Sequence, residues 1–182
     1  MPKIGETKVG ETGTQFYIGI DPGASGGLAV IRTRLSPNGP ELYSPPQVTA
    51  IKMPETPRDI WDWIRQGSST NTFAVIEKVG GFVKGNPVPG SAMFNFGKGA
   101  GWLEMALIGA WIPYEEAMPQ KWQKALGIPP KKKDETKTAW KNRLKKKAQQ
   151  LFPTLAAGSI TLATADALLI ATYCQRLREG KL

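Results

Sequence analysis

Three acidic residues stand where a negative charge is costly. Asp21 ends the apolar run YIGID (17–21), directly before a glycine-rich turn, and Glu77 follows the apolar letters TFAVI. Asp166 directly precedes ALLIA, another apolar run. A carboxylate at the tip of a buried element is unfavourable unless a proton, a cation or a hydrogen-bond donor compensates it. Asp21, Glu77 and Asp166 are therefore the candidates for chemistry.

Carboxylates that converge in space favour a divalent cation between them. If the strands that end at Asp21 and Glu77 are neighbours, their like charges repel strongly unless a cation or a proton lies between them. Magnesium-type ions prefer oxygen ligands and usually keep water and substrate phosphate in their shell. Three carboxylates beside a basic helix suit metal-assisted phosphodiester hydrolysis, with two ions about 3.5–4 Å apart.

Each acid also has a structural interpretation when it is taken alone. Asp166 lies in the first turns of a helix, where an aspartate often only complements the helix dipole. Glu77 at a strand end is typical of a surface residue. Asp21 is the strongest of the three, because a turn aspartate does not need five apolar residues before it. The combination of the three carries more weight than any single residue.

The composition excludes several other chemistries. The 182 residues include no histidine and one cysteine, Cys174. Serine–histidine and cysteine–histidine catalysis are therefore excluded, a zinc site is disfavoured, and no disulfide framework is expected. No apolar run approaches the roughly 20 residues that span a bilayer. We expect an intracellular protein with no membrane contact.

The positive charge is concentrated in one segment. The net charge is +9, and residues 119–147 hold eleven Lys or Arg against two acidic residues, while the rest of the chain balances. A localised basic segment is typical of a surface that binds a polyanion, most often nucleic acid. A lysine-rich helix that is merely solvated is the alternative.

Hydrophobic patterning predicts an α/β protein with one mixed sheet. The run 134–152 is an amphipathic helix, with Trp140 and Leu144 on one side and Lys137, Lys141 and Lys145 on another. We expect a mobile segment at 1–15 and a single domain at 16–182. The expected strands are 16–21, 27–33, 46–53, 72–78 and 111–118, and the expected helices are 56–67, 91–110, 119–127, 134–152 and 164–179.

Three motifs resemble those of one known family. YIGIDPGASGGLAVI, FAVIEKVGGF and TADALLIA, in this order, are similar to motifs of the RuvC-type Holliday-junction resolvases, a branch of the ribonuclease H-like superfamily. The resemblance covers about residues 16–177 and is greatest to the phage-borne members. It implies a ribonuclease H-like five-stranded mixed sheet, with three antiparallel hairpin strands, two further strands and flanking helices.

The resemblance also implies an activity. The family acts as homodimers that bind four-way DNA junctions and nick two strands symmetrically, with Mg²⁺ or Mn²⁺, two ions per site. Asp21, Glu77 and Asp166 match its metal-binding, catalytic acids. The helix at 91–110 is the candidate dimer contact.

One position departs from the family pattern. The family generally has a fourth acid three residues before the last, and this chain has Ala163 there. Either three carboxylates suffice, or a nearby acid such as Glu115 or Glu116 helps, or an inactivating change has been engineered. We expect weak cleavage with intact junction binding.

The DNA contacts are predicted from charge and aromaticity. Phe82 and Lys84 lie in the loop after Glu77, where an aromatic ring could stack on an unpaired base or fold back onto the core. Trp102, Trp111, Trp122 and Trp140 are assigned to packing. The expected phosphate-binding residues are Lys131, Lys132, Lys133, Lys137, Lys141 and Lys145.

Two other functions compete with a nuclease. Sugar kinases and actin-like ATPases share the strand, DxG and turn opening, but they need a second such loop and about twice this length. A DNA-binding or structural member of the same fold that has lost activity is the other alternative, and Ala163 favours it. Metal binding through Asp21 and Glu77, and nicking that a chelator abolishes, would distinguish a nuclease from both.

Overall fold

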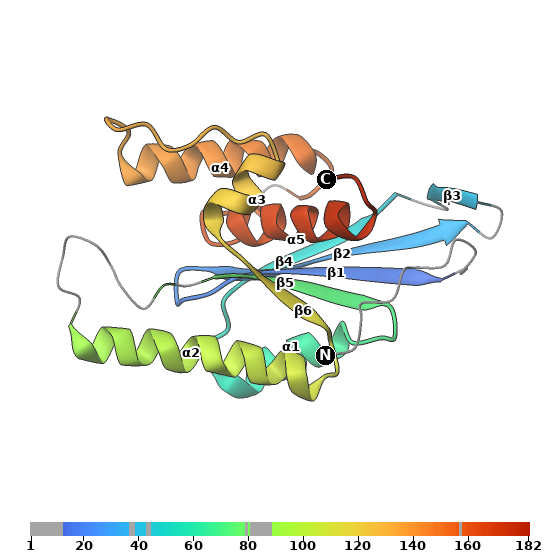
Figure 1. Ribbon diagram of the computed structural model, residues 1–182, viewed down its shortest axis with the longest axis horizontal. Coiled ribbons are helices and arrows are strands. Elements are labelled where there is room, and N and C mark those ends of the chain that lie inside the picture. The colour runs from blue at the N-terminus through green and yellow to red at the C-terminus, as the bar shows by residue number, and fades with distance from the viewer. Residues whose placement is uncertain (1–12, 37–38, 43–44, 79, 81–88, 157) are drawn as a thin grey trace.

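A mixed sheet forms the centre of the molecule, and helices cover both of its faces (Figure 1). The structure is a computed structural model that describes residues 13–36, 39–42, 45–78, 80, 89–156 and 158–182. The strands are β1 (Thr14–Asp21), β2 (Gly27–Ser36), β3 (Gly39–Leu42), β4 (Gln47–Lys52), β5 (Thr72–Glu77) and β6 (Tyr114–Ala117).

The pairing of the strands brings two distant segments side by side. β1 pairs antiparallel with β2, which pairs in turn with β4 and, at its far end, with β3. On its other side β1 pairs in parallel with β5, and β5 pairs in parallel with β6. The carboxyl ends of β1 and β5 therefore lie next to each other at one edge of the sheet.

This architecture confirms the predicted α/β fold with a mixed sheet. The five expected strands form the pairing β4-β2-β1-β5-β6, and the four-residue β3 is an addition that the sequence pattern did not predict. The expected strand at 111–118 is shorter, because α2 ends at Gly109 and β6 begins only at Tyr114. Most of the segment predicted to be mobile, 1–12, lies outside the described residues, and β1 begins at Thr14.

Two groups of helices enclose the sheet. Figure 1 shows α1 and α2 on one face and α3, α4 and α5 on the other. No helix in the described ranges is long and apolar enough to cross a membrane. The helices are α1 (Pro57–Gln66), α2 (Gly90–Gly109), α3 (Pro119–Ala125), α4 (Lys137–Leu151) and α5 (Ala165–Arg178).

Threonine residues define where two of the helices begin. Thr56 precedes α1, with Pro57 at the first helical position, and its hydroxyl accepts a hydrogen bond from the Asp59 N–H. Thr136 caps α4 in the same way, by accepting from the Ala139 N–H at 3.1 Å. Both caps satisfy an N–H that the first helical turn leaves without a partner.

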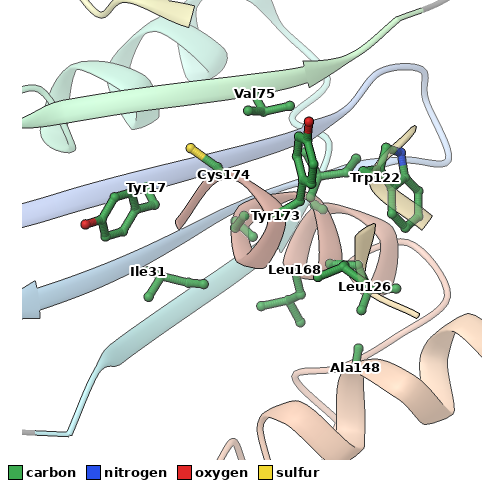
Figure 2. Close-up of a cluster of buried hydrophobic side chains, with 14 of the residues drawn as sticks. Tyr17, Ile31, Val75, Trp122, Leu126, Ala148, Leu168, Tyr173 and Cys174 are labelled. Atoms are coloured by element: carbon green, nitrogen blue, oxygen red, sulfur yellow. The ribbon is translucent and has the colours of Figure 1, made fainter. Parts of the chain in front are cut away.

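The apolar side chains of alternate strand positions divide into two cores. Tyr17 and Val75 point into the core beneath α5, together with Trp122 and Leu168 (Figure 2). Phe73 belongs to the same core. Their strand neighbours belong to the core beneath α1 and α2, which contains Ile18, Ile20, Ala74, Ile76, Ile60, Leu103 and Leu107. Because side chains alternate along a strand, this division fixes which face every β1 and β5 residue presents.

A glycine lets α5 lie directly on β1. A Cβ on Gly19 would stand 2.2 Å from the Ala167 carbonyl oxygen and from the Ala171 nitrogen, so a larger side chain would force the helix away. Further along, the Cys174 thiol lies 3.5 Å from the Phe73 carbonyl. α5 therefore runs antiparallel to β1, which places its N-terminal turn over the end of β1.

One helix leaves an apolar stripe uncovered. Leu103 and Leu107 of α2 are buried against the sheet, whereas Phe94, Met105 and Ile108 on the opposite side of the helix are exposed. Trp111 is 92% exposed and has a φ of 57°. The prediction that Trp111 packs in the core is therefore wrong, because the residue lies in the left-handed turn that follows α2.

Candidate active site

Asp21 and Glu77 lie at the same edge of the sheet and on the same face. Gly19 of β1 is paired with Val75 of β5, so two residues further along Asp21 lies beside Glu77. Residues two apart point to the same face of a strand, and both Gly19 and Val75 face α5. The two carboxylates therefore extend from neighbouring strand ends toward the helical layer of α3, α4 and α5.

Asp166 reaches this point from the first turn of α5. The antiparallel packing of α5 on β1 brings the helix start to the strand end. Asp21 and Asp166 are 8% and 4% exposed, and Glu77 is half-buried. The structure thus brings together the three acids that the sequence singled out, from three elements far apart in the chain.

A lysine from α4 lies between two of these acids. The ammonium of Lys141 donates a 2.5 Å hydrogen bond to Oδ2 of Asp166, and it lies 4.0 Å from Oδ2 of Asp21. The other oxygen of Asp166, Oδ1, is buried and has no hydrogen-bond partner in the structure. Lys141 is half-buried, so its side chain points into the acidic cluster and not along the exposed face expected for it.

The third acid has a neutral partner. The indole N–H of Trp122 donates a 2.9 Å hydrogen bond to Oε2 of Glu77, and the Trp122 side chain is fully buried. Trp122 was assigned to packing alone, and it does pack in the core beneath α5 (Figure 2). Its hydrogen bond adds a second role, because it fixes the orientation of the carboxylate.

The cluster perturbs the proton affinities of its own members. Burial raises the pKa of Asp21 to about 7; the negative charge of Asp166 raises it as well, and Lys141 opposes both. Burial also raises the pKa of Glu77, against the hydrogen bond from Trp122, which lowers it. Burial by itself would lower the pKa of Lys141, but the three surrounding carboxylates raise it above its ordinary value. Mutual effects of this kind require the four side chains to be close together.

The donor set fits a hard divalent cation. As the side chains stand, the described residues contain no group of three or more Asp, Glu, His or Cys side chains that could hold a metal ion. The Lys141 ammonium is the cation that lies between Asp21 and Asp166 in this structure. The partnerless Oδ1 of Asp166 and the oxygen-only ligands match what Mg²⁺ and Mn²⁺ prefer.

Ala163 lies beside this cluster. It is half-buried in the turn before α5, three residues before Asp166. A Cβ on Gly27 would stand 2.7 Å from the Ala163 carbonyl oxygen, and Gly27 is the residue paired with Asp21. The position where the family generally has a fourth acid is thus close to Asp21 and Asp166.

The two alternative acids lie elsewhere on β6. Glu116 is paired with Ile76, whose side chain belongs to the core beneath α1 and α2. Oε2 of Glu116 lies 3.1 Å from the Lys78 ammonium. Glu115 is paired with Val75, two residues before the strand end where Glu77 lies. Glu116 therefore points away from the cluster, whereas Glu115 lies on the same face of the sheet as Glu77, two residues before the strand end.

The other predicted DNA contacts lie on and before α4. Lys131, Lys132, Lys133 and Lys137 are exposed, and Lys145 is half-buried. They precede or follow Lys141 in the chain, and together we call them the basic surface. Their contact with DNA stays a prediction. Phe82 and Lys84 lie outside the described residues.

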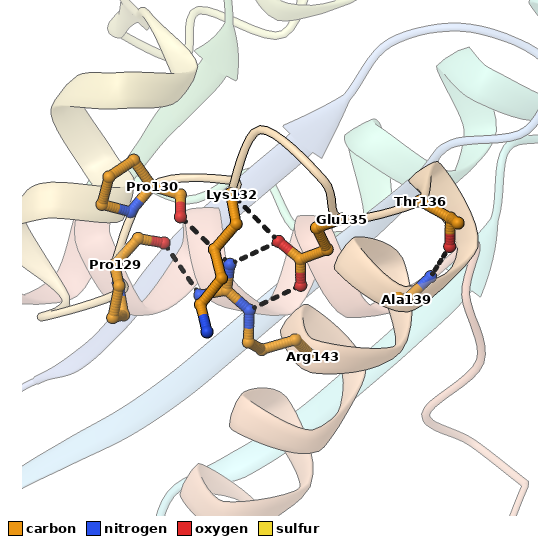
Figure 3. A network of polar contacts seen from close by, with 7 residues as sticks. All are labelled: Pro129, Pro130, Lys132, Glu135, Thr136, Ala139 and Arg143. Carbon is orange, nitrogen blue, oxygen red and sulfur yellow. Dashed lines mark hydrogen bonds and ion pairs between the residues drawn. The ribbon is translucent and has the colours of Figure 1, made fainter.

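A network around Arg143 holds the loop that carries three of these lysines (Figure 3). The Arg143 guanidinium donates to the carbonyls of Pro129 and Pro130 at 2.9 and 3.1 Å. It also forms two hydrogen bonds with the Glu135 carboxylate, which accepts a third from the Lys132 N–H. Arg143 thus links α4 to both ends of the 129–135 loop, which fixes Lys131–Lys133 relative to the helix.

Sequence reasoning missed two contacts of the site. The amphipathic pattern of α4 placed Lys141 with the exposed lysines, and only the position of α4 beside the start of α5 directs its side chain inward. Trp122 carried no signal beyond its apolarity. The spacing of Trp122 from Pro119 places it in the first turns of α3, but the contact with Glu77 depends on the β5–β6 pairing.

Comparisons with known proteins bear on the fold. No family model matches the chain, and no curated protein matches it in sequence. A solved structure of RuvC from T. thermophilus in complex with a Holliday junction substrate matches with a TM-score of 0.53 at 17% identity; the match covers 92% of this chain and 98% of that one. Another structure of Thermus thermophilus RuvC has a TM-score of 0.49 at 17% identity. The chain has a RuvC-like, ribonuclease H-like α/β fold.

Proposed function

We propose that this protein is a structure-selective endonuclease that binds four-way or other branched DNA junctions. It nicks their phosphodiester bonds by hydrolysis that depends on Mg²⁺ or Mn²⁺, with two ions per site. One observation carries the proposal. Asp21, Glu77 and Asp166 converge beside the lysine-rich helix α4, on a fold shared with a protein whose solved structure holds a Holliday junction substrate.

Each residue of the cluster has a role in this reaction. Asp21, Asp166 and Glu77 are the residues that would hold the cations, and Trp122 sets the orientation of the Glu77 carboxylate. When bound, the cations would supply positive charge for the activation of water and for the leaving oxygen. Two of the three carboxylates are attached to strand ends and one to the first turn of a helix. Because these elements are rigid, the carboxylates keep their positions when a phosphate binds.

The basic surface positions the DNA. Lys131, Lys132, Lys133, Lys137 and Lys145 bind phosphates of the DNA backbone. Lysine ammonium groups make such contacts without reading the sequence. Branch recognition then depends on the shape of the junction and on two sites that cut opposite strands. A homodimer supplies those two sites.

The exposed stripe of α2 is the surface that we assign to the dimer. Phe94, Met105 and Ile108 follow a helical spacing on the side opposite the core, and Trp111 follows them after the helix end. Gly97 and Gly101 lie on the same side, and a Cβ on either would meet nothing within 4 Å. An apolar stripe with small residues allows two copies of the helix to approach closely about a twofold axis.

A junction-cleavage assay tests the proposal. A labelled synthetic four-way junction, a flap and the matching linear duplex are incubated with wild type in Mg²⁺, in Mn²⁺ and in EDTA. We expect nicks in the branched substrates with either ion and none in EDTA. Asp21→Asn should abolish nicking while junction affinity is kept or improved, because a charge facing phosphate is removed.

A matched control distinguishes catalysis from general loss of charge. Asp59→Asn changes an exposed acid on α1, across the sheet from the site, and should cut like the wild type. Cutting that persists in EDTA, or in Asp21→Asn, would contradict the metal mechanism. Loss of junction binding in a folded Asp21→Asn variant would make Asp21 a structural residue.

A second function is favoured by Ala163. A protein of the same fold that binds junctions without cutting them would need the basic surface of α4 but no complete ligand set, and Ala163 stands where the family generally has an acid. Junction binding that is equal with and without metal, together with no nicking in any ion, would favour this function.

The motif resemblance also supports a proposal about the source of the protein. We propose that it belongs to the phage-borne branch of the family and acts in the cytoplasm of a bacterial or phage-infected cell.

A further inference from the structure

Lys141 is the cation of the acidic cluster as the structure stands. Its ammonium lies 2.5 Å from Asp166 and 4.0 Å from Asp21, residues of two different elements. Among the ion pairs of the described residues, no other lysine of α4 reaches either acid. Its neighbours Lys137 and Lys146 are exposed. The contact is therefore specific to one position of the helix.

The ammonium satisfies the cluster only in part. It neutralises one charge among three carboxylates, and it leaves Oδ1 of Asp166 buried without a partner. A buried carboxylate oxygen without a partner is unfavourable. A divalent cation carries twice the charge and accepts six oxygen ligands, so it would satisfy the same carboxylates more completely.

The lysine is able to leave. Its charge is carried on a flexible four-carbon stem, and 31% of the side chain is exposed. The lysines of the basic surface, which we assign to DNA phosphates, lie near it in the chain and are mostly exposed. A bound phosphate would therefore offer the Lys141 ammonium a new partner. When Lys141 leaves the cluster, its ammonium therefore exchanges a carboxylate partner for a phosphate partner. The divalent cation takes its place, so no carboxylate is left buried without a cation.

We propose that Lys141 is a built-in competitor for the divalent cations of this site. It holds Asp21 and Asp166 together in the metal-free protein, sets the metal affinity, and is released toward the DNA phosphates when the ions bind. This inference rests on the proposed function, because it needs the acidic cluster to be the metal site. Because linkage is reciprocal, metal binding must weaken the Lys141 ion pairs as much as these pairs weaken metal binding.

Amine labelling of the wild-type protein tests the release directly. The protein is acetylated briefly with a lysine-reactive reagent in EDTA or in Mn²⁺, and the modification of each lysine is measured by mass spectrometry. We expect the labelling rate of Lys141 to rise several-fold on addition of Mn²⁺, with a midpoint at the Mn²⁺ dissociation constant measured by calorimetry. The rate of Lys146, which is exposed on the same helix, should stay constant.

A substitution tests the competition. Lys141→Gln removes the charge and keeps a side chain of similar length, and Lys146→Gln removes a charge from the same helix away from the acids. Calorimetry should give a Kd for Mn²⁺ about tenfold lower in Lys141→Gln than in wild type, because the competent state no longer has to displace the lysine. Lys146→Gln should bind Mn²⁺ like the wild type.

The outcomes of these experiments distinguish a failure of this inference from a failure of the proposed metal site. If Mn²⁺ binds to neither wild type nor Lys141→Gln, the metal site and the inference both fall. If Mn²⁺ binds but Lys141 labelling does not rise, the metal site stands and the competitor role is overturned. If the folded Lys141→Gln variant binds Mn²⁺ with the wild-type Kd, the competitor role is likewise overturned. Should that variant not fold, the labelling of the wild type alone decides.

Discussion

Trp122 and Glu77 are joined by a 2.9 Å hydrogen bond from the indole N–H to a carboxylate oxygen. α3, which carries Trp122, begins two residues after β6, and the last residue of β6, Ala117, is paired with Glu77. The sheet register therefore brings the indole to the carboxylate. Because the donor is neutral, it fixes the carboxylate without competing with a metal ion for its charge.

Trp122→Phe should weaken both the fold and the metal site. It keeps an aromatic ring but removes the N–H and part of the buried volume. We expect the free energy of unfolding to fall by about 1–3 kcal/mol, since a half-buried carboxylate loses its donor, and Mn²⁺ affinity to fall because Glu77 is no longer oriented. Urea denaturation and calorimetry measure the two effects. Trp63→Phe on α1 is the control, and a Trp122→Phe variant with wild-type Mn²⁺ affinity would contradict the orienting role.

Asp21 should make the metal-free protein less stable as the pH rises. Folding raises its pKa from 3.8 to about 7, first through burial and then through the charge of Asp166. Between these values the folded state binds more protons than the unfolded state, so the free energy of unfolding falls with rising pH. From pH 5 to 8 this group should account for a loss of about 2–3 kcal/mol.

Denaturation in EDTA across this pH range measures the effect. Asp21→Asn cannot titrate at this position, so its free energy of unfolding should fall less than that of the wild type between pH 5 and 8. Asp59→Asn, with its change at an exposed position, should lose as much free energy of unfolding as the wild type between pH 5 and 8. Parallel curves for wild type and Asp21→Asn would show that the carboxyl does not keep its proton in the folded state.

The acids were predictable because their positions follow from chain-local patterns. The apolar run before Asp21 and the one before Glu77 each predict a buried strand within two residues of its observed start. Parallel neighbours place their carboxyl ends at one edge, so the convergence of Asp21 and Glu77 follows once β1 and β5 pair. Asp166 joins them because Gly19 admits α5, a close approach that the apolar pattern does not reveal.

The contacts that the sequence did not predict all depend on tertiary placement. Lys141 shares its helical periodicity with the exposed Lys137, and only the position of α4 beside α5 turns its long side chain inward. Trp111 follows Ala110, at the point where the helix ends in a left-handed turn, and apolarity alone suggested that it was buried. β3 has four residues, GPEL, with glycine and proline, which give no strand signal.

Two lysines of the basic surface should contribute to DNA affinity through salt-dependent contacts. In the double variant Lys137→Gln and Lys145→Gln, junction affinity in EDTA should fall most at low salt. The slope of log affinity against log salt should decrease by about one for each lysine. Arg58→Gln with Arg65→Gln, exposed on α1, removes the same charge from the other side of the sheet. If the slope decreases equally in both double variants, junction affinity depends only on the net charge of the protein. If the slope changes in neither, the DNA binds to another surface.

The α2 stripe should hold the dimer together. Ile108 is 53% exposed at the centre of the apolar side chains Met105, Ile108 and Trp111. A glutamate there would bury a charge in the interface. We therefore expect Ile108→Glu to be a monomer by light scattering at micromolar concentrations, and the wild type to be a dimer at the same concentrations. Leu162→Glu is the matched control, because Leu162 is also an exposed apolar residue but lies before α5. Dimerisation of Ile108→Glu would place the interface elsewhere.

Ala163→Asp should strengthen metal binding and cleavage. Its side chain would start one helical turn before Asp166, in the turn whose carbonyl lies against Gly27, the partner of Asp21. A fourth carboxylate adds an oxygen ligand for the ions and raises the repulsion among the acids when no ion is present. The variant should therefore unfold at a lower temperature than the parent in EDTA, recover in Mn²⁺, and nick the four-way junction faster in Mg²⁺ or Mn²⁺. Ala163→Asn, of the same size but without charge, should show neither the loss in EDTA nor the full gain in nicking. If Ala163→Asp nicks no faster than the parent, three acids suffice or the further ligand comes from another residue.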